Sequence, residues 1–149
     1  MLVVQVMGKS KTKIMIQANE LRIGNMVQIP DRRARVSAIF PTHFRATDKD
    51  GIDLGNSLQV NFNPIELTPD ILVSHNFTED NNGHFWKDLH SHYLEFIPMP
   101  DGFYPIWASV GEMSSEPEQR VSLNRINYVH QLQNLFWVLT GQELEIKPQ

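Results

Sequence analysis

The sequence predicts an α+β fold, in which a small N-terminal SH3-like β-barrel leads through a short helix into an antiparallel β-meander with one C-terminal packing helix. Three observations support this prediction. An amphipathic segment ends at Gly141, short apolar segments separated by Pro, Asp and Gly fill residues 21–62, and two strand-like segments flank residues 90–92. We expect the barrel at residues 18–66. The helix, sheet and last helix are expected at residues 67–149, either as a second lobe or as one continuous domain with the barrel.

The C-terminal segment gives the clearest helical pattern. With successive residues about 100° apart around a helix, six apolar side chains fall on one arc: Ile126, Val129, Leu132, Leu135, Phe136 and Leu139. His130, Gln131 and Asn134 fall on the opposite arc, and Gly141 suits a left-handed helix end. Residues 135–139 are all apolar, so this part of the helix has an apolar surface on every side. This predicts that it is buried on two sides, either beneath other elements or in a subunit interface.

The first lobe is expected to consist of short strands. Residues 26–29 stop at Pro30, and residues 36–40 stop at Pro41. The pair Asp50-Gly51 is a good hairpin signal. Strands of this length, separated in this way, favour a small SH3-like barrel, a kind of fold that binds peptides or nucleic acids in many settings.

The second lobe is expected to begin with a short helix, because Thr68 suits the N-cap and Pro69 suits the first helical position. Residues 90–92 are expected to join two antiparallel strands, and residues 112–118, rich in Glu, Ser and Pro, are expected to form a loop. The strands that we expect in this lobe are residues 85–89, 93–99 and 104–107.

Three stretches carry a family resemblance: ELRIGNMV at residues 20–27, PIELTPDIL at residues 64–72, and YVHQLQNL followed by LTGQEL at residues 128–135 and 139–144. They resemble a family of small uncharacterised proteins found in gut Bacteroidetes and in their phages and mobile elements. Members of that family tend to begin near Met15, so we expect residues 1–17 to be a flexible extension. The resemblance implies no catalytic residues, because no activity is assigned to the family.

Composition excludes several classes of protein. A chain of 149 residues suits one domain or two small lobes, and no run approaches the roughly 18 apolar residues that a membrane-spanning helix needs. No signal-peptide pattern is present, so a cytoplasmic protein without membrane contact is expected. The absence of cysteine excludes a disulfide scaffold, thiolate catalysis and cysteine-based zinc sites. Neither glycine-rich phosphate-binding motif occurs, and no cofactor is predicted.

Charge is unevenly distributed along the chain. Residues 1–50 hold nine basic and four acidic side chains, a formal +5, whereas the remaining 99 residues carry a formal −9. A basic half and an acidic half indicate a nucleic-acid-binding face, head-to-tail self-association, or a solvated surface with a basic tail.

His84, His90 and His92, with Asp88 nearby, form the densest group of potential metal ligands. Alternate residues of a strand share one face, so two imidazoles could bind one metal ion. The alternative is that these histidines are solvated at a hairpin tip. No further ligand at helical spacing supports a metal site.

His130 and Asn134 lie four residues apart on the polar arc of the last helix, with Trp137 one turn further. A histidine, an amide and an indole along one stripe suggest a recognition patch, because an exposed tryptophan is a common interface anchor. The alternative is that these side chains support the packing of the helix against the rest of the chain.

Arg32, Arg33 and Arg35 are expected between two strands, with Phe40, His43 and Phe44 close behind, and Arg45 follows. Arginines with interleaved aromatic residues are typical of proteins that bind single-stranded nucleic acids. The alternative is a charged hairpin loop followed by core aromatic residues.

The leading hypothesis from the sequence is a non-enzymatic protein-interaction or assembly module from a phage or mobile element, which binds an unknown protein partner or itself. The first alternative is a nucleic-acid-binding accessory protein that uses the arginine-rich lobe. The second alternative is a metal-dependent hydrolase that uses the three histidines.

Overall fold

The structure is a computed structural model that describes residues 15–109 and 119–146. The chain divides into two compact units, residues 1–64 with 148–149 and residues 65–147. Most of the expected extension at residues 1–17 and the expected loop at residues 112–118 lie outside the described residues. None of the helices in the described ranges is long and apolar enough to cross a membrane.

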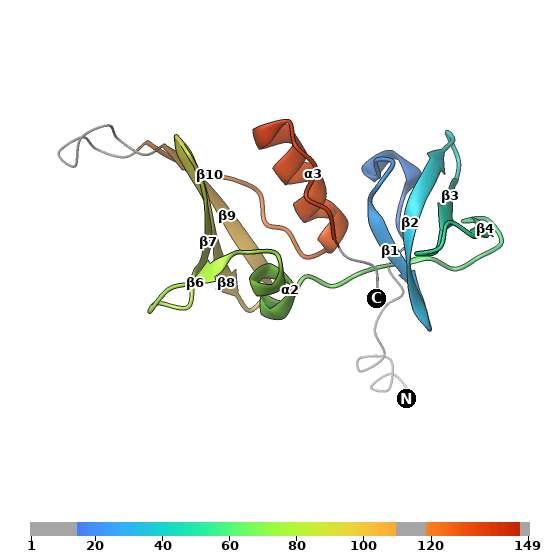
Figure 1. Cartoon of the computed structure of the whole chain (residues 1–149), viewed down its shortest axis with the longest axis horizontal. Helices are drawn as coiled ribbons and strands as arrows, with labels where there is room; N and C mark the ends of the chain where they lie inside the picture. The colour runs from blue at the N-terminus through green and yellow to red at the C-terminus, as the bar shows by residue number, and fades with distance from the viewer. Residues whose placement is uncertain (1–14, 110–118, 147–149) are drawn as a thin grey trace, which may run out of the picture. The chain divides into compact units, whose positions relative to one another are not determined.

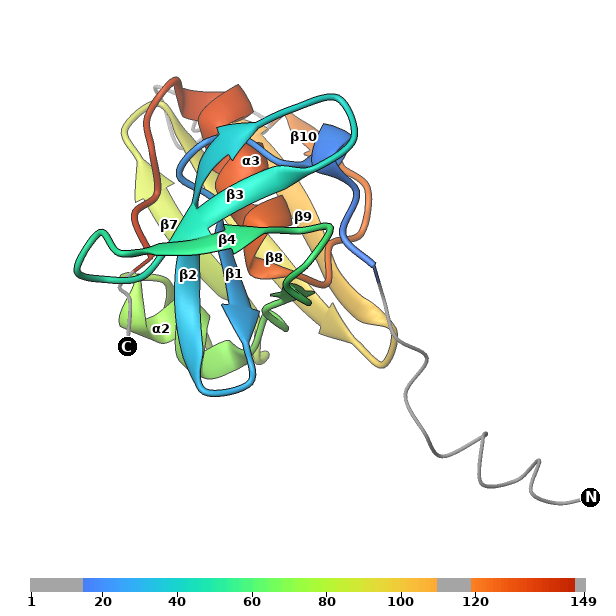
Figure 2. The same ribbon diagram turned by 90° about the vertical axis from the view of Figure 1, so that its right-hand side faces the viewer.

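The first unit is an antiparallel sheet of five short strands in the order β4-β3-β2-β1-β5, and Figure 2 shows β1 to β4 side by side. The elements are the 3-10 helix η1 (Ala18–Glu20) and the strands β1 (Met26–Ile29), β2 (Arg32–Ile39), β3 (Phe44–Thr47), β4 (Asp53–Asn56) and β5 (Asn63–Pro64). The Asp50-Gly51 hairpin is confirmed, because it joins β3 to β4 and Gly51 has a φ of 82°. Among the described residues β4 and β5 are the edges of the sheet, so no closed SH3-like barrel is shown.

One face of the first sheet is the core of this unit. Its buried residues are Leu21, Val27, Ala34, Val36, Phe44, Ala46 and Phe62. The prediction that Arg32, Arg33 and Arg35 lie between two strands is wrong, because all three belong to β2. Pro30 and Asp31 alone form the turn from β1, and Ile29 pairs directly with Arg32.

The second unit contains an antiparallel sheet in the order β10-β9-β8-β7-β6 and two helices (Figure 1). Its strands are β6 (Thr78–Glu79), β7 (Phe85–Leu89), β8 (His92–Met99), β9 (Gly102–Ser109) and β10 (Arg120–Ser122), and its helices are α2 (Pro69–Ser74) and α3 (Val129–Thr140). The predicted meander is confirmed, since β7, β8 and β9 pair in sequence order. The described residues therefore form a sheet-rich α+β protein.

The ends of both helices follow from their sequences. Thr68 Oγ1 accepts a hydrogen bond from the Ile71 amide at 3.3 Å, so the predicted N-cap of α2 is confirmed. Gly141 ends α3 with a φ of 72°, as its position predicted. Ile126 lies outside α3, contrary to its place on the predicted arc, because it forms a bridge with Phe103 of β9 instead.

The two faces of the second sheet differ. Both helices lie on the same side of the sheet (Figure 1). Leu94 and Phe96, which alternate along β8, are fully buried. Tyr93 and Glu95 lie on the opposite face of the same strand, which neither helix covers.

The beginning of the second unit pairs with the residues that lead into α3. The Val129 amide donates a hydrogen bond to the Ile65 carbonyl at 2.9 Å, and the Leu67 amide donates one to the Asn127 carbonyl at 2.8 Å. These bonds join two segments of the second unit that lie far apart in the sequence.

Candidate functional site

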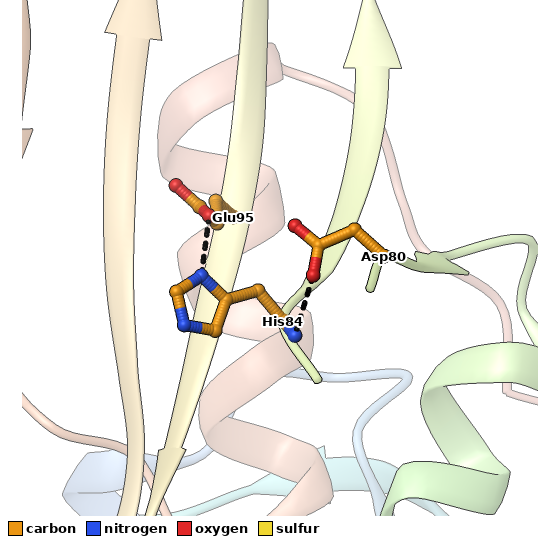
Figure 3. A group of neighbouring side chains, drawn as sticks. All are labelled: Asp80, His84 and Glu95. Atoms are coloured by element: carbon orange, nitrogen blue, oxygen red, sulfur yellow. Dashed lines mark hydrogen bonds and ion pairs between the residues drawn. The ribbon is translucent and has the colours of Figure 1, made fainter. Parts of the chain in front are cut away.

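A cluster of Asp80, His84 and Glu95 lies at the helix-free face of the second sheet (Figure 3). Asp80 directly follows β6, His84 directly precedes β7, and Glu95 lies in the middle of β8. One potential ligand atom from each residue lies within 4.8 Å of the others. The cluster therefore brings together two carboxylates and one imidazole from three positions in the sequence.

The loop between β6 and β7 fixes Asp80 relative to His84. The Asp80 Oδ1 atom accepts hydrogen bonds from the amides of Asn82 at 2.9 Å and His84 at 3.0 Å. The Asp80 amide donates to the His84 carbonyl at 2.9 Å, and Gly83 has a φ of 78°. Asp and Asn favour such turns because their side chains bond to the following amides, and Gly adopts a positive φ without strain.

Glu95 connects the loop to the other edge of the sheet. Its Oε2 atom lies 2.9 Å from His84 Nδ1, and its Oε1 atom accepts a hydrogen bond from Arg120 of β10 at 2.8 Å. Arg120 also donates to the Tyr93 hydroxyl at 3.0 Å. The side chains of Glu95 and His84 are 12% and 28% exposed, so both are partly shielded from water. Partial burial strengthens these polar contacts relative to a fully solvated surface.

The three histidines of the predicted metal site do not come together. His90 lies in the turn between β7 and β8 with a φ of 68°, where its amide bonds to Asp88. His92 stacks on Trp107 with ring centroids 4.7 Å apart. Because residues 92 and 95 of β8 face opposite sides of the sheet, His92 lies away from the Glu95 side. Of the three predicted ligands, the cluster contains His84 alone.

Sequence reasoning missed Asp80 and Glu95, although one signal was present. The segment from Asp80 to His84 reads Asp-Asn-Asn-Gly-His, which is a strong turn sequence that returns His84 to the side of Asp80. Glu95 could be placed beside this turn only through the register of β7 and β8, in which Phe85 pairs with Phe96.

The predicted stripe of His130, Asn134 and Trp137 is divided in the structure. His130 is buried and its ring is parallel to that of Tyr128, with centroids 5.9 Å apart. Trp137 is exposed and Asn134 is intermediate. His130, which the helical period places opposite the apolar arc, is therefore buried, as the packing alternative expects, and of the three residues Trp137 is the most accessible.

Three of the four predicted binding arginines share one face of the first sheet. Arg33 and Arg35 alternate along β2, Arg35 pairs with Thr47, and Arg45 alternates with Thr47 along β3. Arg32 belongs to the opposite face at the end of β2. The shared face lies opposite the buried core residues of the unit.

Carboxylates neutralise part of this arginine group. Arg32 lies 3.3 Å from Asp31 and 3.5 Å from Asp48, and Arg45 forms an ion pair with Asp53. Arg33 and Arg35 line a small pocket of about 50 Å³, with Lys49 and Asp48 also in its wall. The pocket therefore has three basic side chains and one carboxylate, and that carboxylate already contacts Arg32.

The chain matches no protein-family model, no curated protein and no solved structure. Its function is therefore inferred from its own residues.

Proposed function

We propose that the protein is a non-enzymatic assembly module that acts through contacts between copies of its own chain. The proposal includes a cytoplasmic location and an origin in a phage or mobile element, the latter from the resemblance carried by residues 20–27, 64–72 and 128–144. The observation that carries the proposal is the apolar end of α3, where Trp137 and Val138 are 42% and 76% exposed. They are part of the uninterrupted apolar run at residues 135–139.

Exposure of two adjacent large apolar side chains on a regular helix favours a docking role. Tryptophan is enriched among residues that dominate binding energy at interfaces, because it buries a large area at low entropic cost. Covering a Val or Phe-sized side chain contributes roughly 1.5–3 kcal/mol before the costs of association.

The distribution of charge indicates that a second copy of the chain covers the apolar end of α3. Residues 15–64 carry six basic and five acidic side chains, a formal +1, to which Lys9, Lys11 and Lys13 of the expected extension add three positive charges. Residues 65–149 carry four basic and twelve acidic side chains, a formal −8. The first unit of one molecule therefore attracts the second unit of another, which contains α3. A head-to-tail contact of this kind closes into rings or continues into filaments.

Sedimentation velocity over about a hundredfold range of concentration tests the proposal, because self-association depends on mass action. We expect larger species at higher concentration, weakened by salt, and lost in Val138→Glu. The matched control is Val73→Glu, which places the same charge at an exposed site of α2 and leaves assembly intact. A protein that stays monomeric, or equal effects of the two substitutions, overturns the proposal.

The first unit supports an SH3-like module within this proposal. Its strands are short and antiparallel, β1 to β4 pair in sequence order, and β5 returns to pair with β1. Small barrels of that kind commonly present peptide-binding surfaces, which is compatible with an assembly role.

Nucleic-acid binding is a second candidate, and the pocket between Arg33 and Arg35 favours it. Guanidinium groups beside a small pocket suit phosphate oxygens, which Arg binds in bidentate geometry. Fluorescence anisotropy with labelled single- and double-stranded DNA and RNA tests it. We expect binding that weakens with salt and is reduced in Arg33→Ala and Arg35→Ala but not in Arg125→Ala. Absence of binding at low salt removes this candidate.

A further inference from the structure

We propose that Asp80, His84 and Glu95 form a binding site for a divalent transition-metal ion. The inference is independent of self-association, because Glu95 lies on the face of β8 opposite the buried Leu94 and Phe96, and Figure 3 shows His84 and Asp80 beside it. It concerns metal binding and assigns no hydrolytic reaction to the site.

The first support is the set of donor atoms. An imidazole nitrogen and two carboxylate oxygens within 4.8 Å of one another can converge on one ion after small side-chain rotations. Zn²⁺ and similar ions bind imidazole nitrogen and carboxylate oxygen at about 2.0–2.2 Å. Ca²⁺ and Mg²⁺ prefer oxygen ligands alone, so the imidazole favours a later transition-metal ion such as Zn²⁺, Co²⁺ or Ni²⁺.

The second support is that each carboxylate is held through one oxygen. Asp80 Oδ1 accepts from two backbone amides, and the other Asp80 oxygen points toward Glu95 (Figure 3). Glu95 Oε1 is held by Arg120, while Oε2 faces His84. Metal-binding carboxylates are typically oriented by such neighbouring hydrogen bonds, which fix the remaining oxygen for the ion.

A metal ion at this site would replace the proton in the hydrogen bond between His84 Nδ1 and Glu95 Oε2. Glu95 accepts in this bond, so His84 carries its proton on Nδ1. Binding of a metal ion to Nδ1 requires that this proton be absent from Nδ1, with a neutral imidazole protonated on Nε2 instead. In the proposed site His84 Nδ1 and the Glu95 oxygen that faces it would both be ligands of the ion. Arg120 remains on the outer oxygen of Glu95, and its positive charge lowers the affinity of the site.

Cobalt titration of the full chain, purified without a histidine tag and dialysed against EDTA, tests the proposal. Co²⁺ bound by protein ligands gives visible absorption bands, and calorimetry with Zn²⁺ gives the stoichiometry and affinity. We expect one ion per chain. Binding is expected to be lost in His84→Ala and weakened about tenfold or more in Glu95→Gln and Asp80→Asn, because even the loss of a group that only orients a ligand costs about tenfold to a hundredfold in affinity.

The substitutions are chosen so that the fold is kept. In Asp80→Asn the side-chain amide oxygen can still accept from the loop amides, and in Glu95→Gln the side-chain amide oxygen can still accept from Arg120. The matched control is His90→Ala, which removes an exposed histidine of the same unit and leaves binding unchanged. Circular dichroism and metal-free urea unfolding confirm that each variant is folded. No Co²⁺ or Zn²⁺ binding by the unsubstituted protein, or equal binding by His84→Ala, overturns the proposal.

Discussion

Gly102 lies directly against the side chain of Asn127, where a Cβ atom on Gly102 would collide with the Asn127 amide and crowd Arg125. Gly102 also has a φ of 144°, in a region that favours glycine. The Asn127 backbone amide in turn donates to Gln131 Oε1 at 2.8 Å. The first residue of β9 is thus packed against the residues that lead into α3.

Substitution Gly102→Ala is expected to lower the free energy of unfolding by about 3 kcal/mol, because backbone strain and overpacking act together. Gly141→Ala is the control, since Gly141 also has a positive φ but has open space around its Cβ position. Its expected cost is about 1 kcal/mol, which is the strain of an alanine in the left-handed conformation alone. Urea unfolding measures both, and equal losses would contradict the close approach of Gly102 to Asn127.

Phe44 and Phe40 provide a matched pair in the first unit. Phe44 is 1% exposed and belongs to the core, whereas Phe40 is 42% exposed and stacks on His43. We expect Phe44→Ala to cost about 3–5 kcal/mol and Phe40→Ala to cost less than about 1 kcal/mol. Chemical unfolding followed by circular dichroism checks the difference, and a reversed order would show that the core is placed wrongly.

Removal of the N-cap of α2 is expected to lower the stability less than the core substitution Phe44→Ala does. Thr68→Ala removes the oxygen that accepts from the Ile71 amide and is expected to cost about 1 kcal/mol of stability. Thr68→Ser keeps that oxygen and is expected to remain close to the unsubstituted protein. Comparison of the three urea midpoints tests the cap, and a loss in Thr68→Ser as large as in Thr68→Ala would argue against it.

Arg45 is expected to control the acid behaviour of Asp53. The hydrogen bond from the Arg45 side chain, with a further bond from the Gly55 amide, holds the pKa of Asp53 below its usual value. Because the folded-state pKa is lowered, the stabilisation is present above the usual pKa and is lost as pH falls through the folded-state value. Arg45→Gln should therefore raise the pKa of Asp53 in an NMR titration. Arg125→Gln, which removes the partner of Asp101 instead, should leave Asp53 unchanged.

Local sequence signals predicted the elements that depend on local interactions. Thr68 and Pro69 begin α2, Gly141 ends α3, and Asp50-Gly51 turns between β3 and β4. Each depends on hydrogen bonds or backbone angles within a few residues. The residues themselves are therefore sufficient to identify these features.

Features set by distant parts of the chain could not be predicted in the same way. Gln133, although polar, is buried because its Nε2 atom donates to the Leu144 carbonyl beyond the end of α3. The helical period shows which residues share an arc, but not that a later segment returns along that helix. The grouping of Glu95 with His84 likewise depends on strand register, which alternation alone leaves open.

The pairing of residues 65–67 with residues 127–129 affects the order in which the chain folds. In the first unit, β1 to β4 each pair with a neighbour in sequence, so all the partners of these strands are available early in synthesis. In the second unit, residues 65–67 acquire their partners only after about sixty further residues have left the ribosome. A chain whose synthesis stops before residue 127 would contain the complete first sheet, but residues 65–67 of the second unit would lack their hydrogen-bond partners. Such a chain would be recognised by chaperones and cleaved by proteases.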